Sequence, residues 1–175
     1  MKKTVIIAVL LSALTIGSVS ATETGVGGLF GYEGYVAGKF LGSGDASGAG
    51  YSYGGAFAYT NIPFGNFELG IEVGYQSKFT GILFAGLYGL YNFELVEGLA
   101  VYPKLGADFS LLLDMGLDIQ AGAGISYDFT KLLGLGVVVR FEVLFDTYIG
   151  FGGNFFDPGA IALGPKFNLA VGYKL

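Results

Sequence analysis

The sequence contains no cysteine, no histidine and no tryptophan. Without cysteine there is no disulfide framework, and without cysteine or histidine the usual ligands of a zinc site are missing. The absence of histidine also excludes the Ser–His and Asp–His arrangements that many hydrolytic enzymes use. We therefore expect no enzymatic activity, no cofactor and no metal centre.

Charged residues are also scarce, at 13% of the chain, and they include no basic cluster. This argues against nucleic-acid binding. The N-terminus carries Lys2 and Lys3, an apolar run over 5–16, and the small residues Val19-Ser20-Ala21. This order is typical of a secretory signal peptide, and the run is shorter than the roughly 20 residues of a spanning helix. We expect a signal peptide over 1–21 and one domain over 22–175, with removal of two lysines changing the net charge from −5 to −7.

Glycine is abundant, with 32 residues in a chain that is 53% hydrophobic. The glycines have no collagen period, and the hydrophobicity is too high for a disordered chain. Within strands, glycine permits sharp curvature and close packing. Both are needed inside a small β-barrel.

The final segment, Ile161 to Leu175, alternates apolar residues with small or polar ones without a break. Successive side chains of a strand point to opposite faces, so one face of this strand requires an apolar surrounding. Seven earlier segments repeat the pattern more or less clearly. The predicted strands are 28–37, 51–60, 67–76, 82–95, 100–111, 117–129, 135–146 and 161–175.

These segments predict an all-β fold, an eight-stranded antiparallel up-and-down transmembrane β-barrel with lipid outside and a polar lumen. Closure is required because an open edge in lipid leaves backbone groups unpaired. Pro103 and Pro165 lie within predicted strands, so each is expected at a bulge or near the rim. The alternative is a soluble secreted barrel with an apolar ligand cavity, which would place Arg140, Glu142 and Lys166 outside.

Aromatic residues gather near the predicted strand ends, as in the interfacial girdles of outer-membrane barrels. The expected girdle residues are Tyr59, Phe67, Tyr75, Tyr91, Phe93, Tyr127, Phe129 and Tyr173. The high strand propensity of Tyr and Phe would explain the same positions without a membrane.

On these strands, and on the final Phe167-x-Leu169-x-Val171-x-Tyr173-x-Leu175 segment, the chain resembles the small eight-stranded outer-membrane barrels. These include the transmembrane domain of outer-membrane protein A and the OmpX/Ail group. The final segment is similar to the C-terminal assembly signal of that family, which usually ends in Phe where this chain has Leu175. The resemblance implies a location in the outer membrane of a diderm bacterium. It also implies outer-membrane lipids and the barrel-assembly machinery as partners, and a monomer.

The inward-facing charges are the candidate functional residues of the lumen. They are Glu33, Glu72, Lys104, Arg140, Glu142 and Lys166. Counted from the strand starts, they are expected at similar depth, where three acids and three bases would form a salt-bridged plug. The alternative is a porin-like gate in which these residues change partners and open a narrow ion path.

The segment over 147–159 is predicted to be the last external loop. Its aromatic residues Tyr148, Phe151, Phe155 and Phe156 are candidates for contact with a host or surface ligand of unknown identity. They would equally suit insertion into the membrane interface. The leading hypothesis is a structural outer-membrane barrel with narrow pore activity, and the alternative is an adhesin that acts through its loops.

Overall fold

A computed structural model describes residues 23–40, 44–77, 82–111, 115–151 and 158–175. The predicted signal peptide over 1–21 lies outside these ranges. Within them, no helix has both the length and the apolar character needed to cross a membrane.

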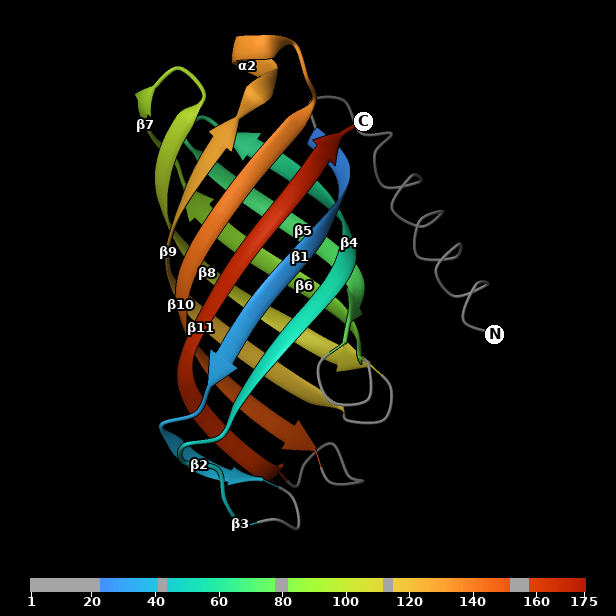
Figure 1. Ribbon diagram of the computed structural model, residues 1–175, viewed down its shortest axis with the longest axis vertical. Coiled ribbons are helices and arrows are strands. Elements are labelled where there is room, and N and C mark those ends of the chain that lie inside the picture. Colours follow the sequence, from blue (N-terminus) through green and yellow to red (C-terminus); the bar gives the residue numbers. More distant parts are fainter. Residues whose placement is uncertain (1–22, 41–43, 78–81, 112–114, 152–157) are drawn as a thin grey trace, which may run out of the picture.

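Eight long strands form a closed antiparallel barrel (Figure 1). They are β1 (Glu23–Gly34), β4 (Gly50–Phe64), β5 (Phe67–Gln76), β6 (Ile82–Tyr91), β8 (Leu99–Leu111), β9 (Gly116–Asp128), β10 (Val137–Phe151) and β11 (Pro158–Lys174). Each pairs with the next one along the chain, and β11 returns to pair with β1. The predicted eight-stranded, antiparallel, up-and-down architecture is confirmed.

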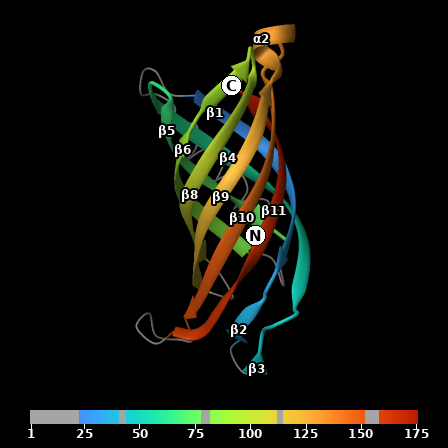
Figure 2. The ribbon, with the colours of Figure 1, turned by 90° about the vertical axis from the view of Figure 1, so that its left-hand side faces the viewer.

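Four short elements extend the barrel at its two ends (Figures 1 and 2). The strands β2 (Ala37–Phe40) and β3 (Gly44–Asp45) lie at the end opposite the C-terminus. The strand β7 (Phe93–Val96) and the helix α2 (Phe129–Leu133) lie at the C-terminal end. The helix was not predicted, because the sequence prediction continued the strand to Phe129. Asp128 caps the helix N-terminus, and Gly134 ends it with φ of 67°.

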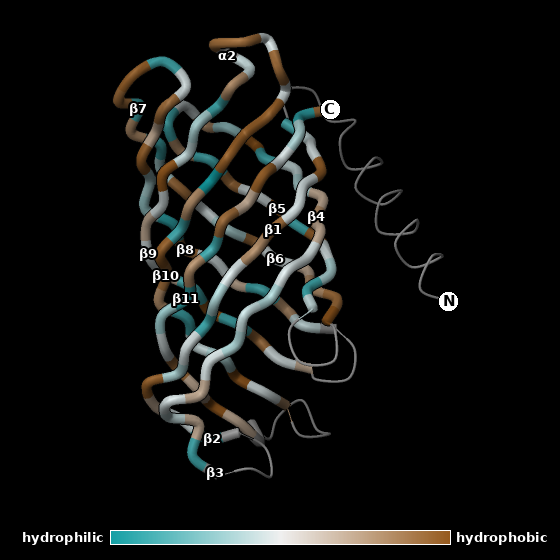
Figure 3. The backbone as a smooth tube through the Cα atoms, viewed as in Figure 1, coloured by the Kyte–Doolittle hydropathy of each residue, from teal (hydrophilic) through white to brown (hydrophobic). Residues whose placement is uncertain are grey.

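The outer surface is apolar and the interior is polar, as the alternation predicts. Phe30 and Leu105 are 62% and 64% exposed on the outside, whereas Glu33 and Asp146 are fully buried inside. Figure 3 shows hydrophobic and hydrophilic residues alternating along β10 and β11. Because Glu142 and Lys166 are also buried, the alternative of a barrel with its charges outside is wrong.

Inward-facing glycines explain how aromatic rings fit inside so narrow a barrel. In the β1–β4 register, Gly25 lies opposite Tyr59 and Gly31 lies opposite Tyr53. A Cβ atom at either glycine would lie 2.5 Å from the ring of that tyrosine. The predicted girdle position of Tyr59 is therefore wrong, since its ring fills the lumen over Gly25.

Seven other predicted girdle residues lie on the outer surface, in keeping with their predicted facing. Phe67, Tyr91, Phe93 and Tyr173 are exposed near the C-terminal end, and Tyr75 is exposed near the opposite end. Tyr127 and Phe129 are partly exposed, with their ring centroids 4.6 Å apart.

Both strand prolines lie where the hydrogen-bonded ladder is interrupted. The β6–β8 pairing ends at Leu90–Lys104 and resumes as β7–β8 at Phe93–Val101, which leaves Pro103 between the two. The β1–β11 pairing ends at Glu33–Lys166, and the β2–β11 pairing begins at Ala37–Leu163. One extra residue therefore lies opposite Gly164 and Pro165, so the expected bulge at Pro165 is confirmed.

The predicted loop over 147–159 is wrong at both of its ends. The strand β10 continues to Phe151, and β11 begins at Pro158. Pairing continues from Thr147–Leu163 to Gly150–Ala160. The segment therefore extends the hairpin, although its glycine-rich and aromatic composition is also typical of a loop.

Candidate functional site

The central contact of the lumen joins Lys104 on β8 to Glu142 on β10. The Lys104 Nζ atom donates to both Glu142 carboxylate oxygens at 3.0 Å. Tyr102 donates its hydroxyl to the same carboxylate at 3.1 Å, and the Asn168 amide donates at 3.3 Å. Since Lys104 and Glu142 are only 9% and 5% exposed, this is a buried and well-coordinated ion pair.

Arg140 forms a second, looser group beside this pair. Its guanidinium donates to the Tyr88 hydroxyl at 3.3 Å and lies 5.5 Å from the centre of the Tyr59 ring. The nearest acidic contact is Glu68, at 3.8 Å, which is longer than a hydrogen bond. Arg140 thus pairs with Glu68, a residue outside the predicted network.

Tyr88 connects the two groups. The Lys104 ammonium lies 4.6 Å from the centre of the Tyr88 ring, close enough for a cation–π interaction. The Tyr88 hydroxyl in turn donates to Asn61 at 2.7 Å. Tyrosine hydroxyls therefore complete the network, and the sequence prediction, which considered charges only, did not include them.

Lys166 belongs to a third group, toward the end opposite the C-terminus. Its ammonium lies 3.9 Å from Asp108 and 6.0 Å from the centre of the Tyr53 ring. Gln120 donates to the same Asp108 carboxylate, and Glu33 is the cross-strand partner of Lys166.

Glu33 is also part of a buried group of three carboxylates. Tyr35 donates its hydroxyl to Glu33, and one oxygen each from Glu33, Asp118 and Asp146 lies within 4.8 Å of the others. Carboxylates held so close repel one another unless protons or cations neutralise part of their charge.

The six predicted residues therefore divide among separate groups and do not form one plug at one depth. Glu72, the remaining member, faces the lumen beside Gly86, where an added Cβ would lie 3.2 Å from its Cγ. Counting from strand starts was misleading because barrel strands tilt and are staggered against each other.

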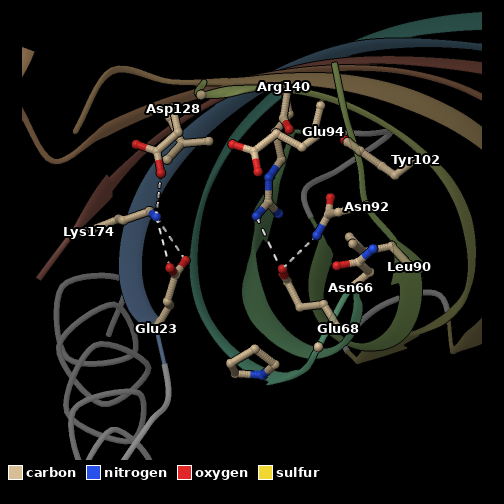
Figure 4. Close-up of a pocket in the computed structure, with 16 residues that line it drawn as sticks. Glu23, Asn66, Glu68, Leu90, Asn92, Glu94, Tyr102, Asp128, Arg140 and Lys174 are labelled. Carbon is tan, nitrogen blue, oxygen red and sulfur yellow. Dashed lines mark hydrogen bonds and ion pairs between the residues drawn. The ribbon is translucent and has the colours of Figure 1, made fainter. Parts of the chain in front are cut away.

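At the C-terminal end the lumen opens into a vestibule of about 310 Å³ (Figure 4). Lys174 binds Glu23 at 3.0 Å and Asp128 at 2.7 Å on one side. On the other side Asn92 donates to Glu68 at 3.3 Å. Arg140 and Tyr102 line the vestibule and also contact the central groups, so the vestibule ends at those groups. A further cavity beside Arg140 has only about 10 Å³, the limit for one water molecule.

The predicted loop contacts receive no support from the described residues. Tyr148 is 7% exposed and faces the interior, where its ring covers Gly116. Phe151 is the last residue of β10, and its N–H donates to the Met115 carbonyl at 2.8 Å. Phe155 and Phe156 lie outside the described residues.

The predicted assembly-signal residues lie on the outer face of β11, with Leu175 directly after its last residue. Phe167, Leu169, Val171, Tyr173 and Leu175 are all exposed. Their alternation with inward residues matches the prediction, and the last strand presents an apolar outer face between its neighbours β1 and β10.

No family model matches the chain, and no curated protein matches it. Among solved structures, Neisserial surface protein A is similar over 89% of this chain and 98% of its own, with 10% identity and a TM-score of 0.49. This identity is too low to transfer a function.

Proposed function

We propose that this chain is an integral protein of the bacterial outer membrane, exported by residues 1–21 and inserted as a monomeric barrel. The observation that carries the proposal is the facing of the side chains. Large apolar residues are exposed all around the outside, while Glu33, Glu142 and Lys166 are buried inside. A soluble monomer rarely exposes so continuous an apolar surface, whereas lipid requires it.

The proposed role is structural rather than enzymatic, with outer-membrane lipids and the barrel-assembly machinery as partners. The exposed apolar outer face of β11 is the surface that the machinery would recognise. No nucleic acid is involved, because the outer surface is apolar and the lumen is acidic.

In the resting state the lumen is closed by the Lys104–Glu142 pair and by Arg140. Narrow conductance follows when these groups change partners. The 3.8 Å distance between Arg140 and Glu68 supports this, because no hydrogen bond joins these two side chains. Arg140 has only its 3.3 Å hydrogen bond to the Tyr88 hydroxyl to release before it moves. The tight Lys104–Glu142 contact makes openings rare.

Planar-bilayer recording of the refolded, heat-modifiable protein tests this role. The wild-type protein should show rare, small openings. Glu142→Gln removes the anchor of Lys104 and should make openings more frequent, while Lys39→Met, on β2 outside the lumen, should leave them unchanged. Silence from both the wild type and Glu142→Gln, in protein shown to be inserted, would reduce the role to a closed scaffold.

A further inference from the structure

Acidic side chains outnumber basic ones along the described lumen. In the vestibule four carboxylates accompany Arg140 and Lys174, and in the middle two accompany Lys104. Toward the opposite end four accompany Lys166. In that order, the ten carboxylates are Glu23, Glu68, Glu94, Asp128, Glu72, Glu142, Glu33, Asp108, Asp118 and Asp146.

The excess is not balanced by Lys39, the remaining lysine whose side chain the structure describes. Lys39 is the cross-strand partner of Ile161, which is 46% exposed on the outer face. Partners in an antiparallel pair share a face, so Lys39 points away from the lumen. Its charge therefore contributes little to the field inside.

The carboxylates around Lys166 show how the fold accommodates this excess. Asp108 and Asp118 are direct cross-strand partners, and like charges placed opposite each other are destabilising. The chain places the Lys166 ammonium, 3% exposed, beside Asp108. This group of carboxylates therefore already contains a cation, and that cation is the side chain of a residue on β11.

We propose that the ions admitted by this lumen are small cations, and that Lys166 is the resident cation that must move aside for them to pass. The inference rests on the proposed pore activity and names the charge class of the permeating ion. An anion would meet more carboxylates than basic groups at every level, in a narrow, low-dielectric passage where such fields are strong. A cation would find oxygen ligands throughout.

The absence of cysteine permits a test that does not depend on conductance. Ser126 lines the vestibule, so Ser126→Cys introduces a single thiol there. Its reaction rates with a cationic and an anionic methanethiosulfonate reagent are compared with those of Ser47→Cys, at an exposed position. The cation-to-anion rate ratio should be about tenfold higher at position 126, and Glu68→Gln should lower it. Equal ratios would overturn the proposal even in a barrel that never conducts.

Position 47 makes the comparison stricter, because an acidic side chain is also close to it: the Ser47 N–H donates to the Asp45 carboxylate. That nearby acid raises the ratio at position 47, so any excess at position 126 comes from the vestibule itself. The ratio also cancels differences in thiol ionisation, which affect both reagents alike.

The second measurement is the reversal potential across a KCl gradient. Wild-type currents should reverse near the potassium equilibrium potential, and Asp108→Asn with Asp118→Asn should reduce that selectivity. Lys166→Met should raise the conductance, while Lys166→Arg and Lys39→Met should not. Anion-selective currents would overturn this inference and leave the pore function intact. Silence would refute the pore function, and the thiol ratios would then decide whether the lumen favours cations.

Discussion

At the scale of single residues, β1 contains two adjacent glycines with opposite roles. A Cβ atom on the inward Gly27 would lie 2.5 Å from the Val171 carbonyl oxygen and 2.7 Å from Phe57 Cζ. On the outward Gly28 the nearest atom would be the Gly55 carbonyl oxygen, at 3.7 Å. Gly27→Ala should therefore lower the free energy of unfolding by about 1–3 kcal/mol.

Gly28→Ala is the matched control, and it should change the unfolding free energy by less than about 1 kcal/mol, because its Cβ meets only ordinary contacts. Urea unfolding of both variants in lipid vesicles gives the comparison. Equal effects would show that the inner wall is not packed as tightly as described.

The Glu142 carboxylate accepts hydrogen bonds from three side chains in the centre of the lumen, those of Tyr102, Lys104 and Asn168. Glu142→Gln keeps the shape but removes the carboxylate that the buried Lys104 ammonium binds directly. Removing one partner of a buried ion pair should lower the unfolding free energy by about 3 kcal/mol. Adding Lys104→Met to Glu142→Gln should recover part of that loss, because the ammonium is then removed together with the carboxylate that it binds. The recovery stays incomplete because Glu72 also loses its neighbouring cation. Lys39→Met should stay within about 0.5 kcal/mol of the wild type in the same urea titrations.

At the scale of elements, α2 depends on Asp128. Its side chain accepts from the Thr130 N–H at 2.9 Å and from Lys174 at 2.7 Å. Asp128→Ala removes the cap, which is worth about 1 kcal/mol. The Gly134 N–H, bonded to the Thr130 carbonyl at 3.0 Å, should then exchange its hydrogen about fivefold faster.

Asp128→Asn keeps a capping oxygen and removes the charge, so it separates the two roles of this side chain. Asp128→Asn should weaken the contact with Lys174, while the hydrogen-exchange rate of the Gly134 N–H should stay at its wild-type value. If Asp128→Ala left the Gly134 exchange rate unchanged, the helix would be held by packing rather than by its cap. Asp45→Ala, at the other end of the barrel, is the control for both.

Strand facing was predictable from the sequence because lipid and a polar lumen impose a strict period of two. Over 100–110, 117–125 and 161–175 the burial pattern follows the predicted period of two. The ends of elements were harder to predict. The alternation continues through Phe129, and only Asp128 and Gly134 mark the helix. Over 147–151, the glycine and aromatic residues are compatible with a loop as well as with a strand. Only the pairing with 160–163 shows that this segment is a strand.

At the scale of the whole molecule, strand tilt decides which charges meet. Following cross-strand partners, Lys166 is aligned with Leu144, Gly122, Lys104, Leu90 and Glu68. That row crosses the tilted strands, so it runs from the carboxylates around Lys166 toward one end to the vestibule at the other. The sequence shows that these side chains face inward. It does not show the stagger, and so it could not predict that Arg140 meets Glu68 or that Lys104 meets Glu142.

The relation of the whole barrel to lipid can be measured with single tryptophans, since the chain has none. Phe141 is 46% exposed on the outer face of β10, and Tyr102 is 2% exposed in the lumen. In vesicles that contain brominated lipids, the fluorescence of Phe141→Trp should be strongly quenched and that of Tyr102→Trp should be nearly unaffected. The physical reason is contact, because the quencher acts only at short range and the barrel wall separates the lumen from the acyl chains. Quenching of Tyr102→Trp alone would mean that the two faces are reversed. No quenching of Phe141→Trp would mean that a surface other than lipid covers the apolar exterior.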